Sequence, residues 1–241
     1  MLSEEIRARM AENVAQIRQK MAEAAKEAGR DPAEIQLCAA CKTRTVEEVR
    51  ASADLAIDLF GENHVQELVE KTDAGAYAGK PGHFIGHLQT NKVNKVVGRA
   101  AMIESVDSAR LLDKVARAAA GRSLVQDILI EINIGEEASK SGVREDDLWA
   151  LLEDAAARPS VRLRGLMAIP PADAAPDETR AFFARMRELL AKAAGRHYEN
   201  AVMDTLSMGM SGDYPAAIRE GATIVRIGTA IYGARDYSKK G

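Results

Sequence analysis

Residues 35–42 read Ile-Gln-Leu-Cys-Ala-Ala-Cys-Lys, and this stretch predicts a buried strand that ends at a lysine. Side chains alternate between the two faces of a strand, so Leu37 and Cys41 should share one face. That face is the more apolar one, and we expect it to meet covering helices. Lys42 has the parity of Cys38, so it should leave the strand on the opposite face, pointing inward.

The same kind of short apolar segment recurs along the chain, each separated from the next by a helical stretch. The expected strands are Ile35–Cys41, Leu55–Phe60, His83–Gly86, Met102–Ser105, Val125–Ile132, Val161–Ala168, Ala201–Ser207 and Thr223–Ile227. The expected helices lie near Val46–Ala53, Val65–Ala74, Thr90–Val97, Ala109–Ala120, Glu145–Ala157, Pro176–Ala194 and Ala216–Glu220. Eight strands with intervening helices favour a closed parallel (β/α)8 TIM barrel of the α/β class over an open doubly wound sheet. No glycine-rich dinucleotide fingerprint follows the first strand, which also argues against an open nucleotide-binding sheet.

An additional helix precedes the first strand. Apolar residues from Ile6 to Met21 recur at helical spacing, and Gly29 ends the run. The chain stops soon after the eighth strand, so this N-terminal helix could take the place of a last outer helix. The 241 residues contain no linker or repeat, and we expect one barrel domain over 1–241. A helix that closes the ring would exclude a partner copy, which favours a monomer.

The composition excludes several classes of protein. Apolar residues make up 46% and charged residues 29%, which suits a folded core, and the net charge of −3 gives no general footprint for nucleic acid. Lys92, Lys95 and Arg99 share one helix, but such a row usually forms a solvated face. No apolar run is long enough to span a membrane, and the charged N-terminus lacks a secretory signal. We expect a cytoplasmic protein that binds neither nucleic acid nor membrane.

Two residue pairs resemble metal or redox sites but do not suit one. Cys38 and Cys41 lie three apart on a strand, so they should point to opposite faces and can neither bridge nor chelate. His83 and His87 lie four apart on a strand, about 13 Å from each other, which is too far to share a metal. We predict no metal, and His87 remains a candidate residue at the mouth of the barrel.

The functional face of a parallel barrel lies at the C-terminal ends of its strands. Lys42 occupies the first of these ends, and a partly desolvated amine there can form a Schiff base with an aldehyde. The alternative is a solvated loop lysine. Asn63 follows the second strand and offers both a donor and an acceptor, although it could instead cap the next helix.

The last two strands end in loops suited to an anion. Barrels often bind phosphate with these two loops. Ser207, Ser211 and Thr229 offer hydroxyls there, and Gly228 permits close backbone approach. Arg226 interrupts an apolar strand, and a buried guanidinium needs a partner. That partner is either a carboxylate across the barrel or a ligand, such as a ring nitrogen or an anion.

At this point the residues resemble those of a known family, the pyridoxal phosphate homeostasis proteins, whose alanine-racemase-like barrel belongs to fold-type III. The matching blocks run in order through Cys41-Lys-Thr, Phe60-Gly-Glu-Asn-His-Val-Gln-Glu67, His83-Phe-Ile-Gly-His-Leu-Gln-Thr-Asn-Lys92, Asn133 to Gly142, Leu163-Arg-Gly-Leu-Met-Ala-Ile-Pro170, Leu206-Ser-Met-Gly-Met-Ser211 and Val225-Arg-Ile-Gly-Thr-Ala-Ile-Tyr-Gly233. This chain departs from the family at Gly82, His64 and Gly212, where tryptophan, tyrosine and an acidic residue are common.

The resemblance implies that pyridoxal 5'-phosphate forms a Schiff base with Lys42. It implies that Arg226 faces the pyridine nitrogen, that Ser211, Gly228 and Thr229 bind the phosphate, and that Asn63 and Ser207 line the pocket. An arginine at the ring nitrogen disfavours its protonation and weakens the ring as an electron sink.

We therefore expect a carrier that keeps the cofactor sequestered and delivers it to apo-enzymes, with no robust catalysis and no catalytic residues. The alternatives are an amino-acid racemase and a barrel that binds phosphorylated metabolites. Alanine racemase also has a further β domain and a partner-subunit tyrosine. Lys140 is a weaker hypothesis, as an acceptor of the cofactor during transfer.

Overall fold

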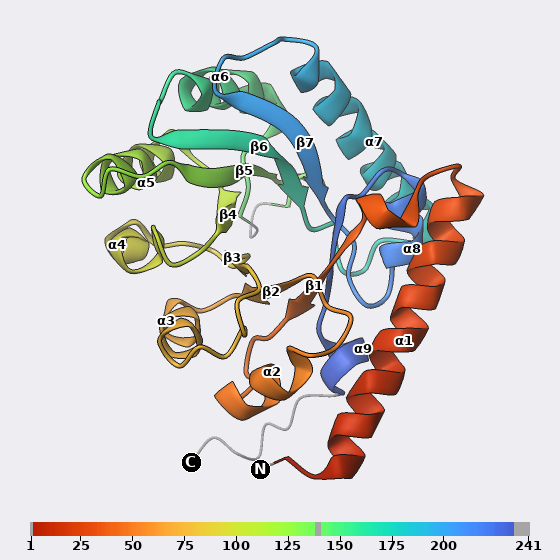
Figure 1. Cartoon of the computed structure of the whole chain (residues 1–241). Coiled ribbons are helices and arrows are strands. Elements are labelled where there is room, and N and C mark those ends of the chain that lie inside the picture. The colour runs from red at the N-terminus through yellow and green to blue at the C-terminus, as the bar shows by residue number, and fades with distance from the viewer. Residues whose placement is uncertain (1, 138–140, 234–241) are drawn as a thin grey trace.

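Every strand of the barrel pairs in parallel with the next one along the chain, and β8 returns to pair with β1. The computed structural model describes residues 2–137 and 141–233. The strands are β1 (Gln36–Ala40), β2 (Leu59–Glu62), β3 (Gly82–Phe84), β4 (Met102–Val106), β5 (Gln126–Ile132), β6 (Val161–Ala168), β7 (Ala201–Ser207) and β8 (Ile224–Ile227). The predicted (β/α)8 barrel is therefore confirmed, and Figure 1 shows its strands enclosed by helices.

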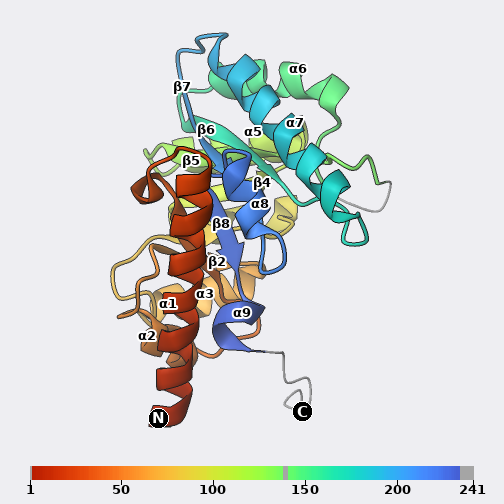
Figure 2. The ribbon, with the colours of Figure 1, turned by 90° about the vertical axis from the view of Figure 1, so that its right-hand side faces the viewer.

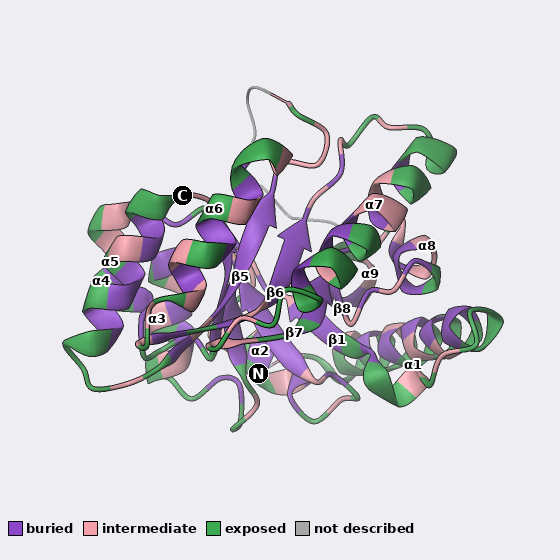
Figure 3. Cartoon of the chain, turned by 90° about the horizontal axis from the view of Figure 1, so that it is seen from above, coloured by how far each residue is buried: buried purple, intermediate pink, exposed green. Residues whose placement is uncertain are grey.

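Helices cover the outside of the barrel. They are α1 (Glu4–Glu27), α2 (Val46–Ser52), α3 (Val65–Asp73), α4 (Val93–Val96), α5 (Ala109–Ala120), α6 (Glu145–Ala156), α7 (Pro176–Ala194), α8 (Tyr214–Arg219) and α9 (Thr229–Tyr232), with short 3-10 turns at Pro32–Glu34 and Thr90–Lys92. Their exposed residues lie on the outer faces, while the strands are largely buried (Figure 3). Among the described residues, no helix combines the length and the apolar character needed to cross a bilayer.

The two faces of β1 divide as the sequence predicts. Leu37, Ala39 and Cys41 join the main core between the strands and the helices. Cys38 packs inside the barrel against Leu59. This division follows from the alternation of side chains along a strand, and it directs the residue after Cys41 toward the barrel mouth.

Helix α1 takes a place in the outer ring, as the sequence suggested. It packs against α8 and α9 on one side and against α2 on the other, and Figure 2 shows it running alongside α8 and α9. Its buried residues include Met10, Val14, Ile17 and Met21, which recur at helical spacing. Arg30 follows the helix and ties it to the end of α8 by donating to the carbonyl of Ile218 at 2.8 Å.

Some expected boundaries are wrong, and β2 shows why. The sequence predicts a strand over Leu55–Phe60, whereas β2 runs over Leu59–Glu62. The preceding segment is a connection in which the Asp58 carboxylate accepts the backbone N–H of Leu37 at 2.6 Å and binds Arg18. The apolar segment predicted as a strand therefore also contains residues of the connection before β2, and Asp58 in that connection is held by hydrogen bonds. Similarly, the helix expected over Thr90–Val97 is a 3-10 turn followed by the short α4.

Candidate functional site

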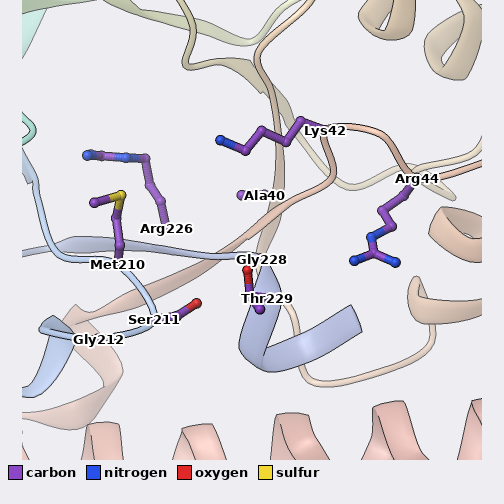
Figure 4. A pocket seen from close by; sticks show the side chains of 9 residues that line it. All are labelled: Ala40, Lys42, Arg44, Met210, Ser211, Gly212, Arg226, Gly228 and Thr229. Atoms are coloured by element: carbon purple, nitrogen blue, oxygen red, sulfur yellow. The ribbon is translucent and has the colours of Figure 1, made fainter. Parts of the chain in front are cut away.

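A cavity of about 220 Å³ opens at the C-terminal end of the barrel, between β1, the β7–α8 loop and the β8–α9 junction. Its lining consists of Ala40, Lys42, Arg44, Met210, Ser211, Gly212, Arg226, Gly228 and Thr229. Five residues predicted from the sequence therefore lie together. In Figure 4, the side chains of Lys42 and Arg226 extend into the same space, and the hydroxyls of Ser211 and Thr229 lie on its other side. We call this cavity the Lys42 pocket.

The charged residues that line the Lys42 pocket are all cationic among the described residues. Three cationic residues line it, namely Lys42, Arg44 and Arg226, whereas no aspartate or glutamate does so among the described residues. Arg44 also pairs with Glu48 outside the pocket at 3.5 Å. A cavity with converging cations, hydroxyls and no carboxylate is suited to an anionic ligand.

The two loops at the edge of the pocket are tied to each other. Gly209 has a φ of 92°, and a Cβ there would lie 2.6 Å from the Cβ of Ala217, so this turn requires glycine. The Gly209 carbonyl accepts the backbone N–H of Arg226 at 2.9 Å. The Ser211 hydroxyl accepts the backbone N–H of Ala230 at 3.4 Å. The loop after β7 and the residues after β8 therefore form one wall.

The backbone on both sides of Lys42 is held from the helix layer. The Lys71 Nζ donates to the carbonyl of Cys41 at 2.8 Å. The Glu67 carboxylate accepts the backbone N–H of Thr43 at 2.8 Å, and Thr43 has a φ of 67°. Because both peptide neighbours of Lys42 are bonded to α3, the direction in which Lys42 leaves β1 is fixed.

Lys71 is itself held in a buried ionic cluster that we call the Glu62–Lys71–Glu67 cluster. Its Nζ lies 2.9 Å from Glu62 Oε1 and 3.1 Å from Glu67 Oε2. Burial raises the pKa of Glu62 to about 7 even though the charge of Lys71 acts in the opposite direction. No sequence motif predicts this cluster. The only signal was the four-residue spacing of Glu67 and Lys71 on a helix, which usually marks a surface pair.

Inside the barrel, Arg226 belongs to a chain of buried polar groups that crosses to the opposite wall. Arg226 donates to the hydroxyl of Ser207 at 2.5 Å and to the carbonyl of Ala168 at 3.0 Å. Ser207 donates to Glu104 Oε2 at 2.6 Å, and His83 Nδ1 donates to Glu104 Oε1 at 2.7 Å. The carboxylate that the sequence suggested as one possible partner is therefore Glu104, 3.9 Å from the guanidinium.

This inner chain keeps its carboxylate ionised. Burial would raise the pKa of Glu104, but the hydrogen bond from His83 and the charges of His83 and Arg226 outweigh it, so the pKa lies below its ordinary value. Ser207 is fully buried and does not line the Lys42 pocket. It connects Glu104 to Arg226, and in this way fixes the guanidinium that does line the pocket.

Asn63 and His87 lie elsewhere at the mouth, in a second cavity of about 290 Å³ that we call the Glu131 cavity. Its lining consists of Asn63, Ile85, Gly86, His87, Glu131, Ile132, Ser141 and Ile169. A Cβ at Gly86 would lie 2.3 Å from the carbonyl oxygen of Asn63, so glycine lets the end of β3 approach this residue. Asn63 does not cap the next helix, because the N-cap position of α3 is His64.

The remaining sequence hypotheses concern cysteines, metals and Lys140. Cys38 and Cys41 are both free and buried, on opposite faces of β1, and burial raises the pKa of each thiol. Within residues 2–137 and 141–233, no group of three or more His, Cys, Asp or Glu side chains could hold a metal ion. Lys140 lies outside the described residues.

Comparisons with known proteins agree on the family. The family model described as alanine racemase, N-terminal domain, matches residues 7–236. A pyridoxal phosphate homeostasis protein of Aquifex aeolicus is 40% identical over 226 residues, covering 94% of this chain and 98% of that protein. The protein of the same name from Pseudomonas aeruginosa is 42% identical over 228 residues, covering 95% and 96%.

Solved structures extend the comparison to the fold. PipY of Synechococcus elongatus, with pyridoxal phosphate bound, superimposes with a TM-score of 0.81 at 31% identity, covering 93% of this chain and 100% of that one. Alanine racemase from Corynebacterium glutamicum has a TM-score of 0.67 at 17% identity, covering 96% of this chain and 63% of the racemase. The racemase likeness shows a shared barrel.

Proposed function

Because the chain belongs to the family of pyridoxal phosphate homeostasis proteins, we propose that it binds pyridoxal 5'-phosphate in the Lys42 pocket and acts in the homeostasis of that cofactor. The observation that carries this proposal is the meeting of one amine, Lys42, with a wall of hydroxyls and a buried arginine in a cavity that no described carboxylate lines. The relative PipY has been solved with pyridoxal phosphate bound, which supports the same ligand here.

The residues of the pocket fit the chemical groups of this cofactor. The phosphate would lie against Ser211, Gly228 and Thr229, where hydroxyls and glycine backbone face the cavity. Lys42 would hold the cofactor covalently as a Schiff base through its Nζ. Bound in this way, pyridoxal phosphate supplies an electrophilic carbon that reacts with primary amines.

Arg226 has a defined role in this proposal. The Arg226 residue is 4% exposed, and Ser207 and the Ala168 carbonyl fix the orientation of its guanidinium. A fixed cation opposite the pyridine nitrogen keeps a proton off that nitrogen, which limits the ability of the ring to accept electrons. The protein would therefore retain and deliver the cofactor to apo-enzymes without robust turnover of amino acids. Ser207 acts in this account as a positioning residue.

Borohydride reduction followed by peptide mass mapping tests the proposal. The holo-protein should carry a reduced phosphopyridoxyl group on the peptide that contains Lys42. The Lys42→Ala variant should lose that label, whereas the control Lys92→Ala, in the 3-10 turn before α4, should keep it. A label on any other lysine would overturn the assignment.

An amino-acid racemase is the alternative, favoured by the barrel shared with alanine racemases. Racemisation needs a second acid or base on the far side of the substrate, and none of the described tyrosines lines the Lys42 pocket. Incubating the holo-protein with L-amino acids in deuterated water separates the two functions. Steady inversion or α-deuteration would favour the racemase, and the carrier should show neither.

A further inference from the structure

The Glu131 cavity contains a carboxylate for which the fold provides no partner. Glu131 lies near the end of β5 and is 8% exposed, yet its side chain makes no hydrogen bond or ion pair with any residue that the structure describes. An unpartnered buried carboxylate is costly, and burial together with the charge of Asp107 raises the pKa of Glu131 to about 7, against the opposing charge of Arg226. Such a carboxylate either destabilises the folded protein or is stabilised by a ligand that carries the missing partner.

The lining of the cavity indicates which ligand would complete it. Asn63, His87 and Ser141 contribute polar groups, while three isoleucines provide apolar surface. His87 is itself engaged, with its Nδ1 at 3.2 Å from the Ser141 hydroxyl and 3.4 Å from Asp107. No lysine or arginine lines the cavity among the described residues. The charge therefore favours a cation, and the isoleucines favour one with an aliphatic stem.

We propose that the Glu131 cavity binds a primary alkylammonium group, with Glu131 as its counter-ion and Ile85, Ile132 and Ile169 in contact with its stem. The charged head would lie against the carboxylate and donate a further hydrogen bond to the Asn63 amide oxygen. An α-amino acid suits the cavity less well, because its own carboxylate would find no described cation there and would face Glu131.

The site also has a chemical consequence. An ammonium can transfer one proton to the Glu131 carboxylate, which leaves a neutral amine and a neutral carboxyl group, with no net change of charge. Only the neutral form of an amine is nucleophilic. This part rests on the proposed function, because a free amine beside the Lys42 pocket matters only if that pocket holds a cofactor that amines displace. The binding itself does not depend on the cofactor.

Titration of the cofactor-free protein with three matched compounds tests the binding. The compounds are 3-methylbutylamine, the neutral 3-methylbutanol and leucine, which share a 3-methylbutyl chain, while leucine adds a carboxylate next to its amine. Calorimetry or NMR should detect the amine with a dissociation constant of roughly millimolar order, and at least about tenfold weaker binding of the alcohol and of leucine. Equal binding of amine and alcohol would overturn the proposal without the need for any variant.

Two variants locate the site. Glu131→Gln preserves the shape of the side chain and should weaken amine binding by about tenfold or more, while alcohol binding stays unchanged. Glu70→Gln removes an exposed carboxylate from α3, outside the cavity, and should leave amine binding unchanged. Unchanged amine affinity in Glu131→Gln would refute the role of Glu131.

The same variant separates this proposal from the previous one. Glu131→Gln should still be labelled on Lys42 by pyridoxal phosphate and borohydride, because Glu131 does not line the Lys42 pocket. Amine binding without a label on Lys42 would leave the ammonium site standing and overturn the cofactor assignment. A label on Lys42 without amine binding would support the cofactor assignment and overturn the ammonium site.

Discussion

Glu104 and Glu131 lie on adjacent strands and are both buried at the barrel interior, yet their surroundings are opposite. Both oxygens of Glu104 are hydrogen-bonded, to His83 and Ser207, and its pKa is lowered. Glu131 has no described partner, and its pKa is raised to about 7. Burial alone therefore does not decide whether a carboxylate supports a fold. The hydrogen-bond donors around the carboxylate decide it, and Glu104 has two of them.

Glu62 lies between these two extremes. Its Oε1 binds Lys71, but its Oε2 is buried without a hydrogen-bond partner among the described residues. Its pKa is raised to about 7 despite the adjacent ammonium. The three glutamates form a series with two, one and no bonded oxygens. If the hydrogen-bond and ion-pair partners of these carboxylates determine the stability of the fold, then one substitution in each of the three surroundings should change the free energy of unfolding by a different amount.

The largest effect is expected for Glu104→Leu. This change leaves Arg226 buried, and an arginine cannot escape by losing its proton. Removing one partner of a buried ion pair costs about 3–5 kcal/mol, so we expect the free energy of unfolding to fall by about 4 kcal/mol. Urea denaturation of the cofactor-free protein measures it. A loss no larger than that of an exposed control such as Glu70→Gln would show that the inner chain contributes little.

Lys71→Met should have the second largest effect. It leaves Glu62 without its cation and the Cys41 carbonyl without its donor, and we expect a loss of about 3 kcal/mol at about pH 8. The loss should be smaller at about pH 5, because Glu62 can then take up a proton, whereas Arg226 in the previous variant could not release one.

The double variant Lys71→Met with Glu62→Gln provides the control for this cluster. Removing both charges should restore most of the lost free energy of unfolding, because no uncompensated charge remains buried. If the double variant is as unstable as Lys71→Met, the lost stability comes from packing and not from an uncompensated charge.

Glu131→Gln should have the smallest effect, and in the opposite direction. The folded-state pKa of about 7 lies above the ordinary value of 4.5, so the folded protein binds more protons than the unfolded chain between these two values. Stability should therefore fall as the pH rises through this window. The glutamine removes that fall, and above pH 7 it should raise the free energy of unfolding by about 2 kcal/mol.

Denaturation across the pH range checks this last prediction. Wild type and Glu131→Gln should have similar stability at about pH 4 and should diverge as the pH increases. If the free energies of unfolding of the two proteins change in parallel with pH, then burial does not destabilise the ionised form of Glu131. Glu131 would then not differ from Glu104 in the way described above.

Much of the candidate site follows from local sequence patterns. The alternation along residues 35–42 places Lys42 on the inward face, and the glycines and hydroxyls after the last two strands predict the opposite wall of its pocket. The expected position of α1 in the ring is also confirmed. The predictions for the pocket succeed because each depends on residues close together in the chain, whereas the place of α1 follows from the order of strands and helices along the whole chain.

Other parts of the site could not be predicted in this way. Ser207 reads as a residue that lines the pocket, but it lies inside the barrel between Arg226 and Glu104. Lys71 reads as a surface residue of a helix, yet it is 1% exposed and holds the carbonyl before Lys42. Both roles depend on partners that are distant in sequence or on another layer of the fold.

The sequence by itself determined the number of strands, the face of β1 on which Lys42 lies, and most of the residues that reach the strand ends. Side-chain period and turn chemistry are local, so the chain encodes them segment by segment. Only the tertiary structure decided how those ends are divided, with Lys42 and Arg226 in one cavity and Asn63, His87 and Glu131 in another. That division depends on barrel closure and strand register, which bring together residues whose distance in space no local pattern records.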